Sequence, residues 1–204
     1  MSSAPTPDVP TGNTFDKYAT TNPIEQRMMR GFMTTLDRFV DGIAPTRVLE
    51  VGIGEGIVTQ RLKERFPTVP IIGIDLPDDA LAEHWREDDI GSAFADVMRL
   101  PFPDDAFDLV LAIEVFEHFD DPETALREVA RVCSGSLIAS VPLEPVWRIG
   151  NMARGRYIKD LGNTPGHVNH WGRRAFTKFV AREFTVDDVA TPLPWTMLSA
   201  RPTA

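Results

Sequence analysis

A glycine-rich turn preceded by an acidic residue is the first feature of the sequence that could do chemistry. The turn reads Glu50-Val51-Gly52-Ile53-Gly54-Glu55-Gly56. Glycines let the chain turn sharply and let a ligand approach the backbone closely. A dinucleotide fingerprint would need glycine at position 57, where Ile57 stands, and the Glu50 carboxylate would repel a pyrophosphate. The turn therefore favours a ligand that carries an amino group, with a plain tight turn as the alternative.

Two aspartates follow at positions where a nucleoside could be held. Asp75 ends the apolar run 69–75, and a carboxylate there can accept both hydroxyls of a ribose. Asp96 lies at the end of the short run 92–97, where a carboxylate can accept from an adenine amino group. Each aspartate alone could equally be a helix cap or a turn residue. Together with the glycine turn, they predict the rim of a cofactor site.

Histidines at two places could act on a substrate. His118 closes the run Glu114-Val115-Phe116-Glu117-His118, which follows the apolar run 106–114. Its imidazole can accept a proton near neutrality, so His118 is the candidate general base, with a capping role as the alternative. His167 and His170 lie three residues apart in PGHVNHW. If that loop folds over the pocket, either imidazole could contact an acceptor hydroxyl.

The segment 146–163 combines basic side chains with apolar ones at helical intervals. Its cations are Arg148, Arg154, Arg156 and Lys159, and its apolar positions include Val146, Ile149, Met152, Tyr157 and Leu161. Three interpretations stay open: a solvated helix that closes the pocket, a clamp for an anionic acceptor, or a membrane-surface contact for a lipid acceptor. Trp147 and Trp171 could stack on a planar substrate, although packing is the simpler role.

The elements that must position these residues alternate in type. The apolar runs predict five strands and then two closing strands, at 46–53, 69–75, 92–97, 106–114, 136–142, 184–193 and 195–202. Helical patterns lie at 24–40, 54–66, 78–88, 121–132 and 172–183. Strands that alternate with helices predict a parallel sheet covered on both faces. We expect a single domain over 23–204, with a cofactor half at 46–141 and an acceptor half at 142–204, after a leader and N-terminal cap at 1–22.

Composition excludes several classes of protein. The net charge is −9, and residues 46–141 carry twenty acidic against eight basic side chains, so duplex binding is not expected. Residues 142–204 reverse the balance, with nine basic and five acidic side chains. One cysteine excludes a disulfide framework and a multi-cysteine zinc site. Without a signal-like start or an apolar run of about 18 residues, we expect a cytoplasmic protein.

Three stretches carry a resemblance to a known family: RVLEVGIGEG, IIGID, and the run from FADVMRLPFPDDAFD to ALREVARV. Over about residues 45–142 the chain resembles a class I S-adenosylmethionine-dependent methyltransferase. It is similar in particular to the ubiquinone and menaquinone biosynthesis branch of the type 11 methyltransferases. The pattern from Asp96 to Asp108 is more specific than the glycines. The resemblance implies a Rossmann-like α/β fold, with a seven-stranded, mostly parallel sheet, helices on both faces and an antiparallel last strand.

The resemblance also implies site residues. Glu50, Gly52 and Gly54 would line the methionine end of the cofactor, while Asp75 would hold the ribose and Asp96 with Val97 would frame the adenine. The full cofactor set comprises Tyr18, Glu50, Val51, Gly52, Gly54, Asp75, Leu76, Asp96, Val97 and Glu114, and Phe15 could assist Tyr18. In ubiquinone O-methyltransferases the matching E-x-x-E-H motif holds a divalent cation, which here would involve Glu114, Glu117 and His118. Metal-independent relatives share the motif, so no metal is expected.

We therefore expect an enzyme that moves a methyl group from S-adenosylmethionine to a small-molecule acceptor, by preference a hydroxyl oxygen. Catalytic candidates are His118, His167 and His170, and acceptor-side candidates are Trp147, Arg154, Arg156, Tyr157 and Trp171. A carbon or nitrogen acceptor, including a quinone-like lipid, is one alternative. A nicotinamide-dependent oxidoreductase is another, but it lacks both its glycine and a Tyr-x-x-x-Lys pair. A cofactor-binding module without turnover is the third. The expected partner is an anionic or lipid-like small molecule, with peripheral membrane contact and no nucleic acid.

Overall fold

The computed structural model describes residues 21–87 and 91–203, and the expected leader, Phe15 and Tyr18 lie outside these residues. Its strands are β1 Val48–Val51, β2 Ile71–Asp75, β3 Ser92–Phe94, β4 Phe107–Ile113, β5 Cys133–Pro142, β6 Phe184–Ala190 and β7 Trp195–Pro202. Its helices are α1 Pro23–Val40, α2 Ile57–Arg65, α3 Asp79–Glu87, α4 Pro122–Val132, α5 Val146–Ala153 and α6 Arg173–Val180. Short 3₁₀ turns are η1 Val97–Arg99, η2 Phe116–His118 and η3 Ile158–Asp160.

The seven strands form one sheet in the order β3-β2-β1-β4-β5-β7-β6. Strands β1 to β5 pair in parallel, and β7 runs antiparallel to both β5 and β6. This confirms the predicted mostly parallel sheet with an antiparallel last strand. The strand order reverses between β1 and β4, so their carboxyl ends flank the crevice where ligands bind in such sheets.

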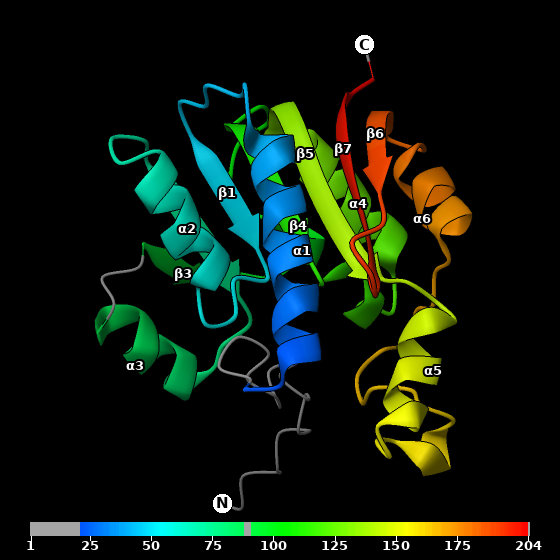
Figure 1. The fold of residues 1–204 in the computed structure, drawn as a ribbon. Helices are drawn as coiled ribbons and strands as arrows, with labels where there is room; N and C mark the ends of the chain where they lie inside the picture. The colour runs from blue at the N-terminus through cyan, green and yellow to red at the C-terminus, as the bar shows by residue number, and fades with distance from the viewer. Residues whose placement is uncertain (1–20, 88–90, 204) are drawn as a thin grey trace, which may run out of the picture.

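Helices cover both faces of the sheet (Figure 1). On one face α1 buries Phe32, Leu36 and Phe39, together with Leu62 of α2. On the other face α4 and α6 pack a second cluster, which includes Ala125, Leu126, Val129, Phe176 and Phe179. No helix among the described residues is both long and apolar enough to cross a membrane.

Several elements are shorter than the sequence patterns predict, each for a local reason. The first strand ends at Val51, because Gly52 adopts a φ of 69° and begins the turn. The third strand ends at Phe94, and the Asp96 carboxylate then accepts a hydrogen bond from the Met98 amide (2.9 Å) at the start of η1. The basic segment is helical only to Ala153, before Gly155 with its φ of 72°.

Candidate functional site

One cavity of about 550 Å³ lies at the carboxyl ends of the central strands. This volume falls in the range of roughly 300–1,000 Å³ that is usual for small-molecule sites. Its lining draws on α1, the glycine turn, the ends of β2 and β4, and the segment from α5 to the loop that precedes α6. The cavity therefore joins the predicted cofactor half to the predicted acceptor half.

The glycine turn is held in place from two sides. The Gly54 amide donates to Asp75 Oδ2 (2.8 Å), and the Trp85 indole donates to the Gly54 carbonyl (2.7 Å). A Cβ at Gly52 would lie 2.3 Å from a methyl carbon of Val115, so a side chain there would displace the segment that follows β4. The glycine at 52 is thus required both by its positive φ and by close packing.

Glu50 places a buried carboxyl group at the cofactor end of the cavity. The side chain is 2% exposed, and Oε2 accepts a hydrogen bond of 2.5 Å from the Thr59 hydroxyl on α2. The pKa of Glu50 is raised to about 8. Burial is the main cause, the Thr59 hydrogen bond opposes it, and the nearby Asp75 carboxylate adds to it. Thr59 was not among the predicted site residues. Its position on α2 beside the buried Val58 and Leu62 is the sequence feature that could have indicated a buried hydroxyl.

Asp75 and Asp96 both line the cavity and both also organise the backbone. Asp75 accepts from the amides of Gly54 and Leu76, each at 2.8 Å, and burial is the main cause of its raised pKa. Asp96 caps η1. The sequence left two alternatives for Asp75 and Asp96, a backbone cap or a ligand contact. In the structure each of them accepts backbone hydrogen bonds and also lines the cavity, so one role does not exclude the other. Leu76 and Val97 line the cavity beside them.

Glu114 adopts an uncommon backbone conformation at the edge of the cavity. Its φ is 59°, a left-handed value that costs energy for a non-glycine residue and often marks functional sites. Oε1 accepts from the Ser140 hydroxyl (3.2 Å) and Oε2 from the Trp195 indole (2.6 Å). These partners come from β5 and β7, so their role could not be predicted from local sequence patterns.

Two histidines meet at the acceptor end of the cavity. The rings of His118 and His167 make an edge-to-face contact with centroids 4.9 Å apart. His118 Nδ1 lies 3.0 Å from the Gly166 carbonyl, and His167 is 8% exposed and stacks on Trp147 at an interplanar angle of 25°. Both imidazoles line the cavity.

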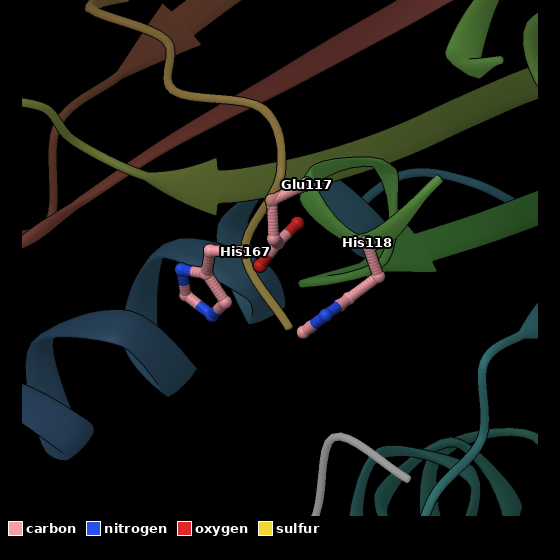
Figure 2. A group of neighbouring side chains, drawn as sticks. All are labelled: Glu117, His118 and His167. Atoms are coloured by element: carbon pink, nitrogen blue, oxygen red, sulfur yellow. The ribbon is translucent and has the colours of Figure 1, made fainter. Parts of the chain in front are cut away.

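Glu117 lies between these two imidazoles (Figure 2). One carboxylate oxygen of Glu117 and one nitrogen each of His118 and His167 lie within 4.8 Å of one another. Among the described residues, this is the one group of three such side chains that could supply metal ligands. This group differs from the metal-ligand set that the resemblance implies, which has Glu114 in place of His167. The Glu114 carboxylate instead accepts hydrogen bonds from Ser140 and Trp195.

Asn169 attaches the loop 165–171 to the turn after β4. Its side-chain amide donates to the carbonyls of Phe116 (3.3 Å) and Phe119 (2.6 Å). The Glu117 carbonyl accepts from the amides of Val168 (2.9 Å) and Asn169 (3.1 Å). Four hydrogen bonds therefore position His167 beside His118. The sequence pattern pointed to the histidines of this loop and assigned no role to Asn169 between them.

Three predicted site residues lie outside the cavity lining, and each is a correction. Val51 is fully buried in β1, and it belongs to the core cluster on the face of the sheet that α4 and α6 cover. His170 is exposed, with Nε2 2.7 Å from Asn163 Oδ1. Trp171 stacks on Phe179 of α6, with centroids 5.0 Å apart. Packing decides the place of Trp171, since α6 offers it an aromatic cluster.

The remaining acceptor-side candidates line the cavity, and Arg154 forms an ion pair there. Trp147, Arg154, Arg156 and Tyr157 all contribute to the lining. The guanidinium of Arg154 contacts Glu25 Oε1 of α1 (3.0 Å) and Asn151 Oδ1 (2.8 Å). Glu25 balances the charge of Arg154, so an anionic acceptor would have to compete with Glu25 for this guanidinium.

Comparisons with known proteins agree with this geometry. Residues 49–137 match the family described as "Methyltransferase domain". A malonyl-[acyl-carrier protein] O-methyltransferase of Geobacter sulfurreducens is 33% identical over 124 residues, which is 58% of this chain and 44% of that protein. A demethylmenaquinone methyltransferase of Thermus thermophilus is 38% identical over 94 residues, or 44% of this chain and 43% of that protein. The chain thus spans less than half the length of either relative.

A solved structure, the PH0226 protein from Pyrococcus horikoshii OT3, shares the fold with a TM-score of 0.70 at 19% identity. The match covers 93% of this chain and 97% of that one. The family implies S-adenosylmethionine as the cofactor, in agreement with a carboxylate rim at the switch point of the sheet. Over residues 49–137, the chain is therefore similar to the methyltransferase-domain family and to relatives that are named as methyltransferases.

Proposed function

We propose that this chain transfers the methyl group of S-adenosylmethionine to a small-molecule acceptor, and that the acceptor atom is a hydroxyl oxygen. One observation carries the proposal. A single cavity is lined by the carboxyl groups of Glu50, Asp75 and Asp96 and by the imidazoles of His118 and His167. The first set suits a cationic nucleoside, and the second set suits a group that must lose a proton.

The cofactor end fits S-adenosylmethionine by charge and by hydrogen-bond type. A buried carboxyl such as Glu50 is costly to ionise alone, and a bound ammonium group would favour its charged form. Asp75 offers carboxylate oxygens for ribose hydroxyls, and Asp96 offers an acceptor for an adenine amino group. When bound, the cofactor supplies a methyl group activated by a positively charged sulfur.

At the acceptor end, His118 is assigned the role of general base. With its Nδ1–H donating to the Gly166 carbonyl, Nε2 keeps a lone pair. Nε2 would then accept the proton of the acceptor hydroxyl when a bound S-adenosylmethionine supplies the methyl group. A general base typically contributes roughly 10²–10⁴-fold, and alignment of the two reactants contributes separately.

The acceptor end also limits the class of acceptor. Trp147 and Tyr157 offer aromatic surface, and Arg156 adds a cation to the lining. The two relatives are named for a malonyl group on a carrier protein and for demethylmenaquinone, which supports an anionic or lipid-like acceptor. Methylation of carbon or nitrogen remains the alternative.

Two measurements test the proposal. Calorimetry is expected to show binding of S-adenosylhomocysteine and no binding of NADH, and the reverse result would refute the cofactor assignment. Transfer of a tritiated methyl group to a panel of phenols, carboxylic acids, amines and quinols then identifies the acceptor atom. Transfer to hydroxyl compounds is expected. Cofactor binding without transfer to any member would favour a module that binds the cofactor and does not turn it over.

A further inference from the structure

The helix α5 has its apolar side turned to solvent. Trp147, Asn151 and Arg154 follow one another at helical intervals and line the cavity. At about 100° per residue, Val146, Ile149 and Met152 lie on roughly the opposite side. These three side chains are 39%, 57% and 38% exposed. A surface helix ordinarily turns its apolar side to the core, so this orientation calls for a partner outside the described chain.

The apolar surface continues into the segment after α5. Ile158 is 61% and Leu161 66% exposed. The Arg148 guanidinium donates to the Leu161 carbonyl (2.9 Å), so this segment packs on α5. Of the ten large hydrophobic side chains that are exposed among the described residues, six lie between positions 146 and 168. We call Val146, Ile149, Met152, Ile158 and Leu161 the apolar lid face.

Charge selects the kind of partner. The segment 146–163 carries four basic side chains, of which Arg154 is paired with Glu25, and one acidic one, whereas residues 46–141 carry twenty acidic against eight basic side chains. An anionic surface would therefore be attracted to this segment and repelled by the cofactor half. Two copies meeting by this face about a two-fold axis would oppose like charges, including the exposed Lys159, and that disfavours a homodimer.

The position of the face relative to the cavity agrees with this choice. In Figure 1, α5 projects from the sheet at the end where the β1 arrow points. Arg154, Arg156 and Tyr157, from the same segment, line the cavity. A molecule held in a lipid layer against the apolar lid face would therefore lie next to the acceptor end.

We infer that the apolar lid face lies on the surface of an anionic lipid bilayer and directs the acceptor end of the cavity toward it. The apolar side chains enter the boundary between headgroups and acyl chains, and the exposed Lys159 beside them contacts the headgroups. Membrane contact itself does not depend on methyl transfer. The consequence that an acceptor is taken from the bilayer does rest on the proposed function.

Vesicle co-sedimentation tests this inference without any acceptor. The full chain is mixed with vesicles of phosphatidylcholine, or of two parts phosphatidylcholine to one part phosphatidylglycerol. Binding to the mixed vesicles is expected to be about tenfold stronger, and to weaken with added salt. The double variant Ile149→Glu, Leu161→Glu is expected to lose about tenfold or more of this binding. Neither residue lines the cavity.

A matched control is Leu193→Glu, at a side chain that is 58% exposed on the connection from β6 to β7. It is expected to bind vesicles like the wild type. All proteins are checked by calorimetry with S-adenosylhomocysteine, which the variants should bind equally well if the cofactor assignment holds. Absence of binding to either vesicle overturns the inference, and so does an equal loss in the control. A dimer that the double variant dissociates, with unchanged vesicle binding, would instead make the face an interface between copies.

Discussion

Glu25 in the first turn of α1 and Arg154 just beyond α5 form an ion pair, with an Nη1–Oε1 distance of 3.0 Å. Both residues line the cavity, and their side chains are only 13% and 32% exposed. The pair therefore connects α1 to the end of α5, and both helices contribute to the lining of the cavity. The acceptor side depends on α1 as well as on the segments after β5.

Replacing Arg154 by methionine is expected to lower the free energy of unfolding by about 1–2 kcal/mol, because Glu25 loses its ion pair in a partly buried place. Urea unfolding measures the change, and a double-mutant cycle with Glu25→Gln isolates the pair. Arg38→Met is the control, since its pair with Asp188 has side chains 58% and 56% exposed and should cost less. Strictly additive effects of the two cavity substitutions would show that the pair contributes nothing.

Glu50 is expected to make stability depend on pH. Its pKa is about 8 in the folded protein against 4.5 for an ordinary glutamate, mainly because of burial. Between these values the folded state binds more protons than the unfolded chain, so stability falls as pH rises through this window. Glu50→Gln should flatten this dependence in urea unfolding. An unchanged slope in the variant would assign the dependence to other groups, such as Asp75, whose pKa is also raised.

The same group predicts proton release on cofactor binding. At neutral pH the Glu50 carboxyl is mostly protonated, and an ammonium group beside it favours the ionised form. Calorimetry with S-adenosylhomocysteine in buffers of different ionisation enthalpy should therefore show release of up to one proton by the wild type. Glu50→Gln should bind more weakly and release fewer protons. Equal release by both proteins would contradict the assignment of Glu50 to the amine.

Asp75→Ala is expected to weaken S-adenosylhomocysteine binding about tenfold or more, through the loss of a two-oxygen contact and of the Gly54 hydrogen bond. Asp78→Ala is the matched control. Asp78 accepts from the Ala80 amide (2.9 Å) at the start of α3 and lies outside the cavity lining. If both variants lose affinity equally, Asp75 acts through the backbone and does not bind the ribose.

His118→Ala is expected to lower kcat by roughly 10²–10⁴-fold and to leave cofactor affinity within about twofold. His170→Ala should be active, because His170 is exposed and contacts Asn163 away from the cavity. Full activity of the His118 variant would transfer the role of base to His167.

Chelation distinguishes a base from a metal centre at the same place. Activity is expected to survive EDTA. A loss that Mg²⁺ or Mn²⁺ restores would instead make Glu117, His118 and His167 metal ligands.

Asn169→Asp keeps the shape of the side chain and removes the donors to Phe116 and Phe119. The loop 165–171 should then be held less firmly, so its amides should exchange hydrogen faster. The expected kinetic result is a higher KM for the acceptor at unchanged cofactor affinity, because His167 is displaced and Glu50 is not. A loss of cofactor binding alone would contradict a role confined to the acceptor end.

Local sequence patterns were enough to predict the order of the elements and the cofactor rim. The glycine turn, Asp75 and Asp96 each follow a strand, and the carboxyl ends of parallel strands meet at one edge of a sheet. Once the alternation of strands and helices is recognised, the convergence of these residues follows from topology alone. That is why the sheet, and the meeting of these side chains at one edge of it, could be predicted from the sequence.

Only the tertiary structure decided the partners of the site residues. Trp195 against Glu114 and Glu25 against Arg154 join residues far apart along the chain, and no local period encodes such contacts. Thr59 against Glu50 depends on how α2 packs beside β1. The same holds for Val51 and Trp171, which pack into the core because buried apolar neighbours are available there. Sequence periodicity determined which side chains share a face of an element, whereas packing between elements determined which of those faces meet the ligand.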